Sequence, residues 1–314
     1  MRRDLSRRAF LERAVCASAL VPLHEIVARP AAAADGMYVS LNGSLTRQMP
    51  WPDFVRLAGK LGYGGVDVNL NAAKTEGVDA TRAILKEMNL KPAVANLPVP
   101  FLTLDEAAFQ DAFKLLPENA QFANAIGLNR MMAVLSPASP VPKDERRKFV
   151  KDRVMAIAEV LQKSSIRLGL EFLGPVYMRS NAKSPHTFMY TLPETVALAA
   201  ECGPNIGVVL DAWHWYHSGG STAEILAAGK ARIVHVHVSD AKPAPPEEVR
   251  DNQRHMPGEG VIDLVGFFQA LKRIGYVDGV SPEPLGRVPA EMTPEDGARL
   301  GLETTLAMMK KAGV

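Results

Sequence analysis

The sequence contains very little cysteine and no long apolar run. The first observation limits disulfide bonds, and the second argues against a membrane-spanning helix. Cys16 and Cys202 are the only cysteines among 314 residues. Cys16 lies within residues 1–34, so residues 35–314 contain a single cysteine and cannot form an internal disulfide. No run of 18 apolar residues occurs anywhere in the chain. We therefore expect no membrane-spanning helix.

A surplus of basic residues is also missing from most of the chain. The formal net charge is +2, but residues 1–34 alone contain six Arg against three acidic residues. Residues 35–314 carry 30 Lys and Arg against 31 Asp and Glu. A large nucleic-acid interface needs a clustered basic surplus, so we expect no nucleic-acid partner. The hydrophobic content of 47% and the charged content of 22% are those of an ordinary globular protein, which excludes wholesale disorder.

The N-terminal segment has the pattern of an export signal. Residues 6–11 (S-R-R-A-F-L) resemble the twin-arginine motif, and a weakly apolar stretch follows over residues 14–27. Four alanines at 31–34 then offer an A-x-A cleavage site before Asp35. We expect a twin-arginine signal peptide over residues 1–34, passage through the twin-arginine translocon, no stable membrane anchor after cleavage, and a periplasmic or secreted location. An amphipathic helix that packs on the domain is the alternative.

From residue 35 onward, short β-branched runs alternate with helical patterns eight times. Several of the runs are apolar on both faces, as is typical of buried parallel strands. The expected strands are 37–41, 65–69, 92–96, 130–135, 167–172, 206–211, 233–238 and 279–283. The expected helices are 51–61, 80–88, 106–125, 143–162, 192–201, 222–229, 263–274 and 293–311.

This alternation predicts the class α/β and a single (β/α)8 TIM barrel over residues 35–314. Eight units of about 35 residues suit such a barrel. No linker or shift in composition divides the segment, which favours one domain over two. A doubly wound sheet is the rival fold, but it usually carries a glycine-rich phosphate loop after its first strand. The sequence there is Asn42-Gly43-Ser44, which does not match a G-x-G-x-x-G loop.

Four consecutive strands in the second half of the predicted barrel carry an acid or an imidazole at or near their carboxyl ends. These residues are Glu171, Asp211, His237 and Glu283. Neighbouring strands lie about 4.8 Å apart, so the four side chains can converge at the catalytic face of a barrel. Three carboxylates in such a place repel one another unless a positive group lies among them. We expect one divalent metal ion, with Mn²⁺, Co²⁺ or Mg²⁺ favoured over Zn²⁺.

Single residues of this set also have structural interpretations. Glu171 could pair with a nearby basic residue, and Asp211 could cap the following helix. His235 and His237 share one face of a strand, and we assign His237 to the cluster and His235 to the hydrogen-bonded core. The two tryptophans after Asp211, Trp213 and Trp215, either offer flat faces to a sugar or pack between barrel and helices.

Two further side chains are candidates for contact with a substrate. His214 follows Asp211 by three residues and can face the same cavity. Arg254 lies in the loop after the seventh strand, where a guanidinium can hold a hydroxyl, a carboxylate or a phosphate with two hydrogen bonds. A surface arginine beside a turn is the alternative for Arg254.

Taken together, these residues resemble the xylose-isomerase-like TIM-barrel family of sugar isomerases and epimerases. The family includes ketose 3-epimerases, hydroxypyruvate isomerases, inosose dehydratases and repair enzymes of the endonuclease IV type. The pattern that carries the resemblance is Glu171, Asp211-x-x-His214, His235-x-His237, Arg254-x-x-Pro-Gly-Glu-Gly and Glu283.

The resemblance spans essentially all of residues 35–314. It also implies roles for six residues of the pattern. It implies that Glu171, Asp211, His237 and Glu283 bind the metal, and that both glutamates also move protons. It further implies that His214 and Arg254 contact the substrate. The early strands match only loosely, with cavity candidates at Asn42, Asn69 and Asn96. The repair branch uses histidines from early strands to hold three zinc ions, whereas here the first histidine after the leader is His186.

We therefore expect a divalent-metal-dependent isomerase or epimerase that acts on a keto-sugar or related polyol through an enediolate. A dehydratase of the inosose-dehydratase type is the alternative on the same scaffold, because an enediolate can also expel a β-hydroxyl. A non-catalytic periplasmic sugar-binding barrel is the alternative of another class, and the presence of both glutamates favours an enzyme. The export signal favours free or glycosidic sugars over phosphorylated ones. The sequence leaves open whether the chain forms a homo-oligomer.

Overall fold

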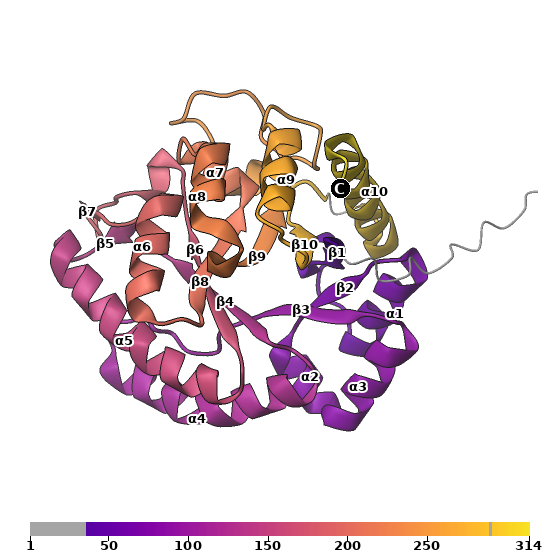
Figure 1. The fold of residues 1–314 in the computed structure, drawn as a ribbon, viewed down its shortest axis with the longest axis horizontal. Coiled ribbons are helices and arrows are strands. Elements are labelled where there is room, and N and C mark those ends of the chain that lie inside the picture. The colour runs from indigo at the N-terminus through magenta and orange to yellow at the C-terminus, as the bar shows by residue number, and fades with distance from the viewer. Residues whose placement is uncertain (1–35, 289–290) are drawn as a thin grey trace, which may run out of the picture.

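The computed structural model describes residues 36–288 and 291–314, and the expected signal peptide over residues 1–34 lies outside this part. Eight parallel strands form a closed barrel in which β1 pairs with both β2 and β10 (Figure 1). The barrel strands are β1 (Tyr38–Leu41), β2 (Gly65–Val68), β3 (Lys91–Asn96), β4 (Arg130–Leu135), β6 (Arg167–Phe172), β8 (Ile206–Asp211), β9 (Ile233–Val238) and β10 (Gly279–Pro282).

A long helix follows each strand and packs on the outside of the barrel (Figure 1). These helices are α1 (Trp51–Leu61), α3 (Val78–Glu87), α4 (Glu106–Ala125), α5 (Lys143–Lys163), α6 (Leu192–Cys202), α8 (Thr222–Arg232), α9 (Leu264–Arg273) and α10 (Pro294–Ala312). The predicted single (β/α)8 barrel is therefore confirmed, because all eight expected strands and helices form within a few residues of their predicted bounds.

The loops contain short elements that the sequence pattern does not predict. They are α2 (Leu70–Glu76), α7 (Ala212–His217), the two-residue strands β5 (Ala138–Ser139) and β7 (His186–Thr187), and the 3-10 turns η1 (Gly43–Leu45), η2 (Val176–Met178) and η3 (Asp251–Gln253). Each is too short for a repeating apolar pattern to reveal it. Side-chain caps begin the two short helices, with Asn69 accepting from the backbone N–H of Ala72 and Asp211 accepting from that of Trp213.

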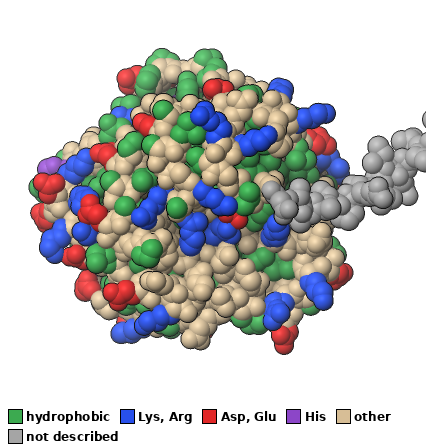
Figure 2. Space-filling model, viewed as in Figure 1, with side chains coloured by type: hydrophobic (Ala, Val, Ile, Leu, Met, Phe, Trp, Pro, Cys, Tyr) green, Lys and Arg blue, Asp and Glu red, His purple; other side chains and the backbone are tan. Residues whose placement is uncertain are grey.

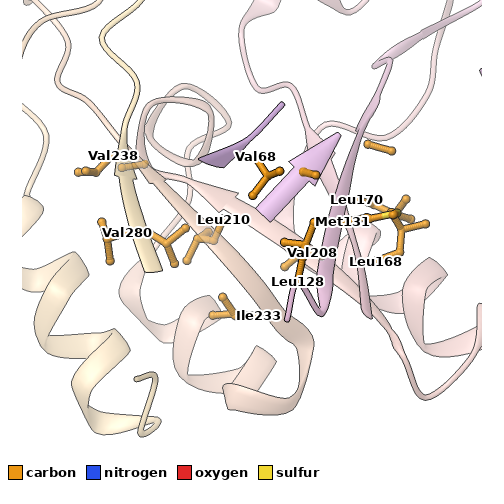
Figure 3. Packing of buried hydrophobic residues seen from close by; sticks show 14 of the residues in the cluster. Val68, Leu128, Met131, Leu168, Leu170, Val208, Leu210, Ile233, Val238 and Val280 are labelled. Atoms are coloured by element: carbon orange, nitrogen blue, oxygen red, sulfur yellow. The ribbon is translucent and has the colours of Figure 1, made fainter. Parts of the chain in front are cut away.

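The strands place apolar and polar side chains on opposite faces, as their two-residue period requires. Leu168 and Leu170 of β6 lie in the large core cluster together with Val208 and Leu210 of β8 (Figure 3). A second, much smaller apolar cluster consists of Val94, Met132 and Val209. Each fully buried aliphatic side chain contributes about 1.5–3 kcal/mol. The large cluster thus stabilises the fold and leaves inward strand positions available for polar groups.

The surface in Figure 2 carries both signs of charge, with Lys and Arg interspersed among Asp and Glu around the rim of the face shown. Many of these charges form exposed ion pairs, such as Lys60 with Glu295 at 2.7 Å. Such pairs contribute only about 0–1 kcal/mol each. None of the described helices has the length and apolar character that a membrane crossing requires.

Candidate metal centre and its cavity

The carboxyl ends of four consecutive barrel strands bring the predicted cluster together. Each of the four residues offers one ligand atom, and these atoms lie within 4.8 Å of one another. Asp211 ends β8 and pairs directly with His237 on β9 in the strand register. The set is completed by Glu171 on β6 and by Glu283, which directly follows β10.

His237 lies at the centre of this cluster. Its Nδ1 is 3.0 Å from Oε1 of Glu171 and 3.5 Å from Oε2 of Glu283. Glu171, Asp211 and His237 are at most 5% exposed, whereas the side chain of Glu283 is 19% exposed. Glu283 is therefore the carboxylate of the cluster that is most open to an incoming molecule.

Arg254 supplies a second positive charge beside the cluster. Its Nη1 donates to Oδ2 of Asp211 at 2.7 Å and to Oε2 of Glu283 at 3.2 Å. Its Nη2 donates to Oδ1 of Asp251 at 2.7 Å and lies 3.1 Å from Nε2 of His214. Arg254 is only 3% exposed, so these are buried, charge-assisted contacts. The hydrogen bonds of Arg254 thereby connect the loop after β9 with the carboxyl ends of β8 and β10.

Burial and the neighbouring charges shift the pKa values of His237, Glu283 and Asp211. Burial opposes the charged form of His237, but Glu283 and Glu171 overcome it and raise the pKa of the imidazole to about 10. Burial raises the pKa of Glu283 to about 7, although His237 and Arg254 act against the rise. Burial also opposes ionisation of Asp211, yet the Arg254 guanidinium holds the pKa of that carboxyl well below its usual range. Among these groups, Glu283 is thus the carboxyl whose pKa lies nearest neutrality when no cation is bound.

The structure places His214 against Arg254 rather than among the residues that line the main cavity. Burial lowers the pKa of His214 to about 3, so its ring is neutral. Because a guanidinium only donates, Nε2 of His214 must accept, and the proton of the ring is on Nδ1. Neither His214 nor Arg254 lines the cavity, and the substrate-binding roles of both stay predictions.

The tryptophans near Asp211 are packing residues. The ring of Trp213 lies 4.8 Å from the guanidinium carbon of Arg254, and Trp215 packs against Phe267 at 5.4 Å between ring centres. Both are at most 4% exposed, and neither lines the cavity. Of their two interpretations, the structure supports packing between barrel and helices.

A second polar network lies next to the cluster, and sequence reasoning missed its central residue. Asp67 on β2 accepts hydrogen bonds from Ser40 at 2.7 Å, Ser281 at 2.8 Å and Asn42 at 2.9 Å. The hydroxyl of Ser281 also lies 2.8 Å from Nε2 of His235, which confirms His235 as a hydrogen-bonded core residue. The signal for Asp67 was present in the sequence, because a lone acid alternates with valines in Gly65-Val-Asp-Val.

A cavity of about 1020 Å³ opens beside the cluster. His237 and Glu283 form part of its lining, and the loops after β1, β2 and β3 form most of the rest. Asn42, Asn69 and Asn96 all line it, which confirms their expected place. The early strands and their loops thus supply most of the cavity walls together with Asp67, while the late strands supply the four clustered ionisable groups.

The donor set fits a divalent cation. Three carboxylates and one imidazole converge within 4.8 Å of one another, which is the mixture of oxygen and nitrogen donors that such ions take. The carboxylates carry more negative charge than His237 and Arg254 can offset with all groups ionised. A bound cation would replace the proton on His237 and supply the missing positive charge.

The model of one protein family matches most of the chain. The description of the family is xylose isomerase-like TIM barrel, and the match covers residues 55–311. The chain therefore belongs to the xylose isomerase-like TIM barrel family, an enzyme family, and the resemblance noted in the sequence is confirmed.

Similar proteins of assigned activity are isomerases and epimerases. The inosose isomerase of Bacillus subtilis is 26% identical over 223 residues, with 71% of this chain and 77% of that protein covered. The L-ribulose-5-phosphate 3-epimerase UlaE of Shigella flexneri is 24% identical over 240 residues, with 72% and 79% covered.

Solved structures show the same fold. A xylose isomerase domain protein from Alicyclobacillus acidocaldarius superposes with a TM-score of 0.80 at 28% identity, over 88% of this chain and 100% of the other. The IOLI protein, whose crystal structure carries a bound zinc atom, superposes with a TM-score of 0.75 at 23% identity, over 88% and 99%.

Arg254→Met tests the charge balance of the site. Removal of the guanidinium leaves Asp211 and Glu283 buried without their cationic partner, and breaking such a pair costs about 3–5 kcal/mol. We expect the free energy of unfolding, measured by urea denaturation, to fall by this amount. Arg299→Met is the matched control, since Arg299 forms an exposed pair with Glu295 and its loss should cost at most about 1 kcal/mol. Equal losses in the two variants would contradict the account of the buried network.

Proposed function

We propose that the protein is a divalent-metal-dependent sugar isomerase or epimerase that acts on a keto-sugar or related polyol. One observation carries the proposal, namely the convergence of Glu171, Asp211, His237 and Glu283 at one side of a polar cavity. The activities named for relatives, inosose isomerase and L-ribulose-5-phosphate 3-epimerase, support a sugar as the substrate.

The four clustered residues would hold the ion. When bound there, a divalent cation polarises a carbonyl oxygen and its adjacent hydroxyl, which makes the neighbouring C–H bond more acidic. The zinc atom bound in a structural neighbour supports a divalent metal. Among the candidates, we favour Mn²⁺, Co²⁺ or Mg²⁺, and Zn²⁺ remains compatible with the donor set.

Two glutamates would move the protons. Glu283 borders the cavity and is the most exposed carboxylate of the cluster, so it can exchange a proton with a bound substrate. Glu171 reaches the cluster from β6, which is separated from β10 by β8 and β9 in the barrel. One glutamate would remove the proton next to the carbonyl, and the other would return a proton to the opposite face or to the neighbouring carbon.

The resulting enediolate has two fates. Return of a proton gives epimerisation or isomerisation, and loss of a β-hydroxyl gives dehydration. The named activities of the relatives favour the first outcome over a dehydratase. The presence of both Glu171 and Glu283 in the cluster favours an enzyme over a non-catalytic sugar-binding barrel, because a binding site has no need for two glutamates that can move protons.

We also propose that the protein is exported by the twin-arginine route. The support is the pattern of residues 1–34, with paired arginines followed by an apolar stretch and small residues. N-terminal sequencing of protein recovered from the periplasm should begin at Asp35. Recovery of the intact N-terminus from the cytoplasm alone would contradict export.

The proposed metal site predicts how many metal ions each chain contains. We expect mass spectrometry of the purified protein to find about one Mn, Co, Mg or Zn ion per chain, and Glu283→Gln or Asp211→Asn to weaken binding at least tenfold. Because the ion competes with protons on His237 and Glu283, whose pKa values are about 10 and about 7, the affinity for Mn²⁺ should rise as the pH increases. Glu259→Gln is the control, since Glu259 pairs with Arg287 outside the cluster. Unchanged metal content in both cluster variants would contradict the site.

The mechanism makes a prediction about proton transfer. During turnover in heavy water, a keto-sugar substrate should gain deuterium at the carbon next to its carbonyl. Glu171→Gln and Glu283→Gln should each slow this exchange by about 10²–10⁴-fold, the usual contribution of a positioned acid or base. Glu259→Gln again serves as the control. Turnover without solvent label, or full exchange in both variants, would contradict proton transfer by the glutamates.

A further inference from the structure

The cavity extends well beyond the metal cluster. Its volume of about 1020 Å³ lies just above the range of about 300–1,000 Å³ that is usual for small-molecule sites. Only His237 and Glu283 of the cluster border it, and the loops after β1, β2 and β3 contribute most of the other lining residues. A single monosaccharide with its carbonyl at the cluster would leave much of this space filled with water.

Side-chain amides are concentrated in the lining that comes from the carboxyl ends of β1, β2 and β3 and the loops that follow them. Gln48, Asn71 and Asn96 line it, are exposed, and form no side-chain hydrogen bond with the described part of the protein. An amide offers both donors and an acceptor, which matches the hydroxyl groups of a sugar. Asn42 and Asn69 line the same region, but Asn42 bonds to Asp67 and Asn69 caps α2.

Two buried polar atoms in the same region also lack a partner. Oγ of Ser44 and Nε1 of Trp51 are both buried, and neither has a hydrogen-bond partner among the described residues. Both residues belong to the lining of the cavity. Because both atoms are closed off from solvent, they lie behind the surface of the cavity, and the three exposed amides are the groups that face a ligand. We refer to Gln48, Asn71 and Asn96 as the amide wall.

The charge of the lining favours a neutral ligand. Among the described residues that line the cavity, Arg47 is the sole Lys or Arg, and its guanidinium donates to the backbone oxygen of Met292. Asp67 and Glu283 contribute carboxylates to the same lining. Sites that recognise phosphate usually gather arginines, and this lining does not.

We propose that the amide wall is a second sugar subsite, and that the natural substrate is an uncharged keto-sugar extended by a further sugar unit. The keto unit lies at Glu283 and His237, and the additional unit lies against the amide wall. This inference rests on the proposed function, because it assumes that the cluster is where the keto unit reacts. It goes beyond that function by naming the substrate class as keto-disaccharides or keto-glycosides.

A matched set of ligands tests the subsite. Isomaltulose and D-fructose 6-phosphate extend D-fructose at the same oxygen, the first by glucose and the second by a phosphate. Lactulose and turanose carry the second sugar at other positions. We expect titration calorimetry with the Mn²⁺-loaded, full-length protein to show at least one of the three disaccharides binding ten or more times as tightly as fructose. Fructose 6-phosphate should bind no more tightly than fructose.

Substitutions in the amide wall test whether these side chains produce the higher affinity for a disaccharide. Asn71→Ala and Asn96→Ala each remove one set of hydrogen bonds, so each should lower the affinity for the preferred disaccharide about threefold to tenfold, and more than the affinity for fructose. Gln121→Ala is the control, because Gln121 is an exposed amide on α4 away from the cavity. This control should leave the ratio of the two affinities unchanged.

The binding measurements test the second subsite, and deuterium exchange tests the isomerase activity, so the two proposals can fail independently. The subsite is overturned if none of the disaccharides binds more tightly than fructose, if the phosphate ester binds best, or if both asparagine variants behave like Gln121→Ala. Deuterium exchange is measured on the same ligands. Exchange into fructose without any preference for disaccharides overturns the subsite and leaves the isomerase intact. Tight disaccharide binding without exchange retains the subsite and overturns the isomerase.

Discussion

The buried carboxylates at the carboxyl end of the barrel require positive charge, and the way it is supplied organises the rest of the site. His237 contacts Glu171 and Glu283 directly, and Arg254 contacts Asp211 and Glu283 from the loop after β9. These contacts raise the pKa of the imidazole, whereas burial raises the pKa of Glu283 to about 7 against the opposing effect of His237 and Arg254. A divalent cation held by the four clustered residues would take the place of the proton on His237.

The two halves of the barrel perform different tasks on a common scaffold. The strands β6, β8, β9 and β10 deliver the ionisable cluster, and the loops after β1, β2 and β3 surround the cavity. Between them, the network of Asp67, Ser281 and His235 links β2, β10 and β9. The division is possible because the main apolar cluster lies between strands and helices, so the interior of the barrel can hold polar groups.

Much of this architecture could be predicted from the sequence, because it depends on short-range rules. The two-residue period of a strand and the position of a residue at its end sufficed to bring Glu171, Asp211 and His237 together. The contact between His214 and Arg254 could not be predicted, since it depends on how two loops fold over each other. The cavity lining from η1 and α2 was missed for the same reason, and Asp67 was missed because a single acid in a short strand resembles a surface residue.

The central claim is that one divalent ion is held by the four clustered residues, and anomalous X-ray diffraction from crystals grown with Mn²⁺ tests it most directly. The account predicts one strong anomalous peak at about 2.0–2.3 Å from an oxygen of Glu171, Asp211 and Glu283 and from Nδ1 of His237. The absence of a peak at this position in a well-ordered site would contradict the claim. A peak at the neighbouring set of possible ligands, Asp67, His235 and His237, would also contradict it.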